Sequence, residues 1–144
     1  MEYKFEKVSK VNIRKQLNNK EVAKRDFISF TKLLDKKILI CNSNNIKMYS
    51  FPTFKLINLI NTPSSVFSVT LLKSKNIACC QHNGKISIYS MSNNKLKLKQ
   101  TLDVLNEKTV FRVKELPNNM LVSCQDEQSI NFYKYNERKK NMLI

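Results

Sequence analysis

Few residues of this 144-residue chain are of types that could form a metal or redox site. The sequence has four cysteines, at positions 41, 79, 80 and 124, and one histidine, His82. A zinc site usually takes its thiolate or imidazole ligands in pairs that lie two to four residues apart. Two of these cysteines are adjacent, so on a strand their side chains point to opposite faces, and the other two lie far away. We therefore expect no metal site and interpret the cysteines as small buried side chains in a reducing compartment.

Catalytic patterns are equally scarce. His82 stands in a polar turn, and Asp126-Glu127 is an acidic pair in another turn. The sequence contains no G-x-S-x-G and no glycine-rich phosphate loop, since Gly84 is its only glycine. It contains no H-E-x-x-H, since His82 is its only histidine. A single turn histidine is typical of a solvated surface. We expect no catalytic residue, no cofactor and no enzymatic activity.

The net charge is the largest deviation in composition, at +15. A basic surface attracts polyanions, so nucleic acid and acidic proteins are candidate partners. The lysines are scattered through every segment, which favours a general role in solubility. No apolar core of a signal peptide is visible, and the longest uncharged run, Leu56 to Leu72, is too polar for a membrane span. We expect no membrane partner and a cytoplasmic location, with the nucleus as the alternative.

A hairpin pattern occurs three times, and these hairpins position the residues of any functional site. Each copy is an apolar strand, a polar turn and a second strand in which apolar and polar residues alternate. The copies are Lys37 to Phe51, Asn76 to Met91 and Met120 to Tyr135. Asparagine is abundant in the turns, where it tolerates positive φ better than most residues do.

The repeat extends beyond the hairpins. An apolar segment precedes each hairpin and another segment follows it, so each unit predicts four short strands. The tyrosines of the units are 40 and 44 residues apart, a period typical of β-propeller blades. The matching residues are Phe27, Phe67 and Phe111, each 22 residues before Tyr49, Tyr89 or Tyr133, with Cys41, Cys80 and Cys124 at equivalent sites within the hairpins.

On these residues the chain resembles the WD40 repeat family from about Phe27 onward. The segments IACCQHNGKISIYS and LVSCQDEQSINFYK are similar to the second strand, turn and third strand of that repeat. The tyrosines stand where the family has tryptophan, and Ser50, Ser90 and Lys134 stand where it has aspartate. The Gly-His pair is absent, so we do not expect the family's buried His–Ser–Asp–Trp network.

The resemblance implies an all-β fold, a partial β-propeller of about three four-stranded antiparallel blades. We assign 25–65 to the first blade, 66–109 to the second and 110–144 to the third, within one segment of 1–144. Residues 1–24 are predicted as an edge strand and loop, with a helix over 11–23 as the alternative. A closed ring needs at least four blades. We therefore expect the chain to be part of a longer propeller, a truncated copy or a subunit completed by self-association.

The resemblance also implies a protein-interaction scaffold that binds other proteins or peptides. In this family the upper face is built from the turn inside each hairpin and the loop leading into each first strand, and such loops are free to carry recognition. A basic RNA- or ribonucleoprotein-associated subunit is the alternative function. The predicted protein-binding residues are Asn42, Asn44, His82, Asn83, Gln125, Asp126 and Glu127 in the turns, with Arg25, Asp26, Ser64, Ser65, Lys108 and Thr109 in the loops.

Overall fold

A computed structural model describes residues 28–103, 108–126, 130–136 and 141–143, and all regular elements in these ranges are strands apart from a short turn at Asp126. The predicted N-terminal strand and loop at 1–24 lie outside the described residues. The strands are β1 (Ile28–Leu33), β2 (Lys37–Asn42), β3 (Asn45–Ser50), β4 (Leu56–Asn61), β5 (Val66–Leu71), β6 (Ile77–Gln81), β7 (Lys85–Ser92), β8 (Lys95–Asp103), β9 (Val110–Leu116), β10 (Met120–Gln125), β11 (Ile130–Asn136) and β12 (Asn141–Leu143).

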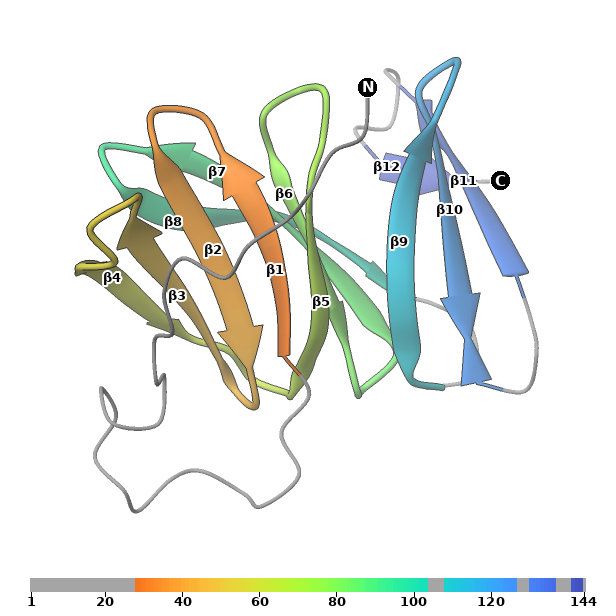
Figure 1. The fold of residues 1–144 in the computed structure, drawn as a ribbon. Coiled ribbons are helices and arrows are strands. Elements are labelled where there is room, and N and C mark those ends of the chain that lie inside the picture. Colours follow the sequence, from red (N-terminus) through yellow and green to blue (C-terminus); the bar gives the residue numbers. More distant parts are fainter. Residues whose placement is uncertain (1–27, 104–107, 127–129, 137–140, 144) are drawn as a thin grey trace, which may run out of the picture.

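The strands form three antiparallel four-stranded sheets in chain order, β1 to β4, β5 to β8 and β9 to β12. Figure 1 shows the sheets side by side, with the first strands β1, β5 and β9 next to one another along the middle. We call the sheets blades 1, 2 and 3. The predicted fold class, an all-β partial propeller, is confirmed, and the three blades do not close into a ring in the described part of the chain.

Asparagine supplies the positive φ angles in two of the tight turns, whereas other turns place Asp35, Lys36, Ser43, Lys75 or Gly84 at such angles. Asn93 and Asn94 form the two-residue loop between β7 and β8, with φ of 50° and 61°. A type I′ hairpin turn requires positive φ at both of these positions, and asparagine adopts it at low cost. Asn118 and Asn119 do the same before β10, with φ of 63° and 56°. Local sequence thus determines where these strands reverse.

Two apolar layers hold the blades together. The layer between blades 1 and 2 contains Tyr89, and the layer between blades 2 and 3 contains Tyr133, so both tyrosines pack against the preceding blade. Aromatic rings bury more area than any other side chain, which suits them to the gap between two sheets. The other members are Leu33, Leu39, Cys41, Ile46, Met48, Val66, Val69, Ile77 and Cys79 in the first layer, and Leu72, Ala78, Cys80, Ile86, Ile88, Leu102, Val110, Val113 and Leu121 in the second.

The strand register corrects the predicted equivalence of the three phenylalanines. Val66 lies opposite Gln81, and a bulge follows it before Ser68, so Phe67 is an inserted residue. Phe111 occupies the same position, at the register shift between β9 and β10. The pairing of β1 with β2 has no such shift, so a constant spacing of 22 residues does not identify an equivalent in blade 1. Phe27 lies outside the described residues.

The equivalence of the cysteines holds in the register, but their burial differs. Cys41, Cys80 and Cys124 lie opposite Ile46, Ile86 and Ile130. Cys41 and Cys80 are buried between blades, whereas Cys124 is exposed. The packing interpretation therefore holds for the first two blades.

We expect one thiol per chain to react with iodoacetamide at pH 8 in the native state, and four after unfolding. Burial blocks access to Cys41, Cys79 and Cys80 and also disfavours their thiolates. It raises the pKa of Cys41 to about 11 and the pKa of Cys80 to about 12. Mass spectrometry of native and urea-unfolded protein measures the label. Native labelling at two or more sites would contradict this packing.

Candidate functional site

The upper face lies at the end of the blades that carries the turns β2–β3, β6–β7 and β10–β11, drawn at the bottom of Figure 1. The loops β4–β5 and β8–β9 reach the same end, because successive antiparallel strands reverse direction. The structure thus brings predicted site residues from all three blades to one face.

Hydrogen bonds join these turns and loops in sequence around the face. The Ser65 hydroxyl donates to Asn44 Oδ1 at 2.9 Å, and the backbone N–H of His82 donates to Ser65 O at 2.9 Å. The N–H of Asn83 donates to the hydroxyl of Ser64 at 3.2 Å. These bonds bind the turn of blade 1 to the following loop, and that loop to the turn of blade 2.

The same arrangement continues into blade 3. Thr109 Oγ1 donates to His82 O at 3.3 Å and lies 3.0 Å from His82 Nδ1. A hydroxyl has one hydrogen, so when Thr109 donates to the carbonyl, Nδ1 carries the hydrogen and donates to Oγ1. The N–H of Asp126 then donates to Thr109 O at 3.0 Å. The upper face is therefore one connected surface, and the single histidine has a structural partner there.

Asn42 and Gln125 were predicted as protein-binding residues in the turns, and the structure corrects this prediction. Their side chains are only 3% and 8% exposed, and each bonds within its own blade. Lys47 Nζ donates to Asn42 Oδ1 at 3.0 Å, and Asn131 Nδ2 donates to Gln125 Oε1. Both residues are buried because they are the last residues of strands β2 and β10 and do not belong to the turns that follow.

Blade 2 has the same kind of pair, in which the Ser87 hydroxyl donates to Gln81 Oε1 at 2.9 Å. Every blade thus ties the end of its second strand to its third strand through a buried amide. Sequence reasoning missed these pairs, although an amide directly after the repeated cysteine was a visible signal.

The remaining predicted residues differ in what the structure says of them. Arg25, Asp26 and Glu127 lie outside the described residues. Lys108 is half-buried, and Thr109, which follows it, is buried and thus also a correction to the predicted surface. Within the described ranges, no group of three or more histidine, cysteine, aspartate or glutamate side chains is placed to hold a metal ion. In the same ranges no helix has the length and apolar character of a membrane span.

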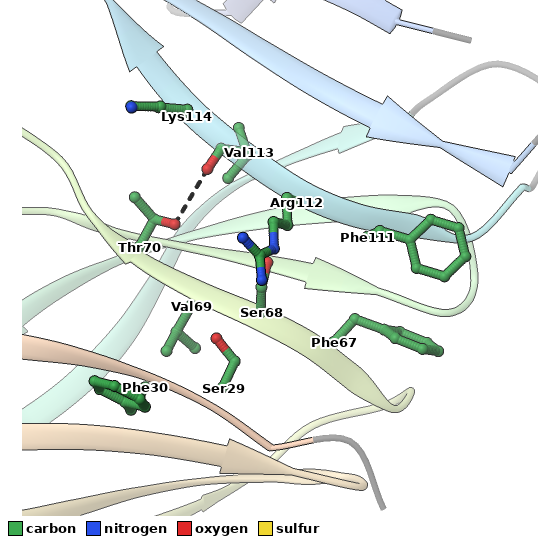
Figure 2. A pocket seen from close by; sticks show the side chains of 10 residues that line it. All are labelled: Ser29, Phe30, Phe67, Ser68, Val69, Thr70, Phe111, Arg112, Val113 and Lys114. Atoms are coloured by element: carbon green, nitrogen blue, oxygen red, sulfur yellow. Dashed lines mark hydrogen bonds between the residues drawn. The ribbon is translucent and has the colours of Figure 1, made fainter. Parts of the chain in front are cut away.

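A groove that the sequence did not predict runs along the first strands of the blades and has a volume of about 630 Å³ (Figure 2). Phe67 and Phe111 lie at one end and Phe30 lies toward the other. The Phe67 and Phe111 rings meet edge to face with centroids 5.5 Å apart, and the His82 ring lies 5.9 Å from Phe67. The aromatic cluster therefore connects the groove to the upper face.

The groove combines apolar and cationic groups. Phe30 is 68% exposed and Phe111 is 39% exposed. Arg112 and Lys114 add positive charge, and Thr70 is held in place by donating to Val113 O at 3.2 Å. Aromatic rings beside cations can receive planar or anionic ligands. The missed signal was the bulge, which turns its inserted residue out of the core.

The three blades have the fold of WD40-type β-propeller blades, as the resemblance implied. Solved structures with this fold include the β-propeller domain of Myceliophteria thermophila Cps50 (Swd1), with a TM-score of 0.68 and 11% identity over 83% of this chain and 43% of that chain. The WD40 β-propeller domain of Doa1 gives 0.63 and 17% identity over 78% of this chain and 38% of that one. A chain of the Mitotic Checkpoint Complex gives 0.66 and 15% identity over 74% and 36%.

No protein-family model matches the sequence, and no curated protein matches it. This chain spans about two fifths of the length of the solved chains above. At these identities the likeness establishes the fold.

Proposed function

We propose that this chain is a non-catalytic protein-interaction scaffold that binds another protein or peptide through its upper face. The observation that carries this proposal is the connected set of hydrogen bonds from Asn44 through Ser65 and His82 to Thr109 and Asp126. Loops held in fixed relation present recognition groups without a large loss of conformational entropy on binding. The fold supports the proposal because the solved structures that share it include a component of the Mitotic Checkpoint Complex.

Site-specific photo-crosslinking in cells tests this proposal. A benzophenone amino acid replaces Asn44 or His82 on the upper face, both of which are exposed. We expect both positions to yield the same discrete protein adduct, because one partner covers turns from two blades. Gel mobility and mass spectrometry identify the adduct.

Asn93 and Asn118 provide matched controls, since they are exposed asparagines in turns at the opposite end of the blades. We expect neither control position to yield that adduct. The same adduct from both ends, or different adducts from Asn44 and His82, would argue against a shared binding face.

The groove favours a second candidate function, the binding of single-stranded RNA. Exposed rings stack on bases, and cations bind phosphates, in proteins that hold single strands. Phe30, Phe111, Arg112 and Lys114 supply both kinds of group in one groove. In the same crosslinking experiment, a nucleic-acid adduct at a benzophenone placed at Phe30, with no protein adduct at His82, would favour this alternative.

A further inference from the structure

The outer face of blade 3 is the third copy of a surface that is buried in the other two blades. Ile46, Ile86 and Ile130 hold equivalent positions, opposite the three repeated cysteines. Ile46 and Ile86 are both 0% exposed, because the next blade covers them, whereas Ile130 is 62% exposed. The contrast arises from the neighbour alone, since the strand, the register and the residue type are the same.

The centre of this outer face keeps its apolar character although it is open. Met48 is 1% and Ile88 is 5% exposed, whereas their equivalent Phe132 is 47% exposed. Cys124 and Ile130 lie beside Phe132 on the same face of β10 and β11. Adjacent exposed apolar side chains on one sheet face are typical of an interaction surface.

The margin of this face is cationic in blade 3, whereas the equivalent positions of blades 1 and 2 are neutral. Small hydroxyl residues occupy three positions around the apolar centre in blades 1 and 2, and cations occupy all three in blade 3. These positions are Ser29, Ser68 and Arg112; Thr31, Thr70 and Lys114; and Ser50, Ser90 and Lys134. In blade 3 all three side chains are exposed. An occupant of this face therefore meets positive charge wherever the covered faces have hydroxyls.

These charges select between the candidate occupants. Two copies joined through this face would bring Arg112, Lys114 and Lys134 against the same residues. A copy joined through the face of blade 1 that points away from blade 2 would bring the exposed Lys32 toward them, and Lys47 and Tyr49 on that face are already buried. Like charges at such contacts oppose association.

We propose that the outer face of blade 3 binds a separate protein that presents an apolar β-sheet face with carboxylates at its margin. A sheet fits because sheets cover the equivalent faces of blades 1 and 2, where Thr70 of one blade donates to Val113 O of the next. Carboxylates fit because they complement Arg112, Lys114 and Lys134. This proposal does not rest on the hydrogen-bonded turns and loops of the upper face, and the surface shares Arg112 and Lys114 with the groove.

A charge-reversed copy of this chain serves as the acidic sheet face for the test. The acidic variant carries Arg112→Glu, Lys114→Glu and Lys134→Glu and keeps the apolar centre. We expect wild type alone and the acidic variant alone to be monomers of 16.9 kDa at 50 mM salt, and their mixture to have twice that mass. Light scattering after size exclusion measures the masses, and circular dichroism checks that the variant is folded.

Substitutions of the apolar centre show whether this face makes the contact. Adding Ile130→Asp and Phe132→Asp to the wild-type partner should raise the dissociation constant at least tenfold. Leu98→Asp is the matched control, because Leu98 is 52% exposed on blade 2, and it should leave the constant unchanged. Complex formation should also slow alkylation of Cys124 at least tenfold.

Three results would overturn the proposal. The first is a mixture that stays monomeric or associates equally well with the Asp substitutions. The second is a dimer of wild type alone that Ile130→Asp dissolves, which would make a second copy the occupant. The third is protection of Cys124 by polyuridylate, with no protection by the acidic variant, which would make nucleic acid the ligand.

Discussion

Ile86→Ala is expected to lower the free energy of unfolding by about 2–5 kcal/mol, the usual cost of removing a fully buried isoleucine side chain. Ile86 is 0% exposed and lies in the apolar layer between blades 2 and 3. Its loss leaves a cavity in the apolar layer between the two sheets. Ile46→Ala should have an effect of similar size in the layer between blades 1 and 2, where Ile46 is also 0% exposed. Urea unfolding followed by circular dichroism measures both.

Ile130→Ala is the internal control for this prediction. The residue has the same type, strand position and cross-strand neighbour as Ile86, but it is 62% exposed. A substitution at an open position usually changes stability by less than about 0.5 kcal/mol. If Ile130→Ala were as costly as Ile86→Ala, the outer face of blade 3 would be covered in solution, and wild type would have to be an oligomer.

Asn42→Ala is expected to lower the free energy of unfolding by about 1.5–3 kcal/mol, the range for a hydrogen bond to a charged group. Lys47 is 0% exposed, and its ammonium group donates to Asn42 Oδ1 at 3.0 Å. Removing this acceptor takes a hydrogen bond from a buried charge. The same urea titration measures the effect.

The equivalent pair in blade 2, Gln81 and Ser87, shows how much of the loss in unfolding free energy comes from the charge of Lys47. Gln81→Ala removes the equivalent acceptor, but its donor is the neutral Ser87 hydroxyl, so we expect a smaller loss of about 0.5–1.5 kcal/mol. Equal losses for Asn42→Ala and Gln81→Ala would show that the buried charge is not the cause.

Local chemistry explains what could be predicted of the fold. Alternation of apolar and polar residues defines a strand within six residues, and positive φ at Asn93 and Asn94 reverses the chain without help from the rest of the molecule. Each hairpin pattern is weak by itself, but three copies at a regular spacing identify a repeat. For that reason the four-stranded units, and the burial of Tyr49, Tyr89 and Tyr133, were predictable.

The candidate site was less predictable because it depends on register. One inserted residue at a bulge turns Phe67 and Phe111 away from the positions that spacing suggested, and thereby creates part of the groove. One residue at a strand end likewise decides whether an amide is in the turn or in the sheet. Asn42 and Gln125 are buried for this reason, whereas Asn44 is exposed.

The sequence by itself determined the period, the strands, the turns and the cationic character of the chain, since each follows from residues close together along it. Only the tertiary structure decided which equivalent positions are covered. Cys41 and Cys124, or Ile86 and Ile130, are indistinguishable in the repeat. They differ because burial on a sheet face requires a second sheet, and the described part of the chain places one after blades 1 and 2 but not after blade 3.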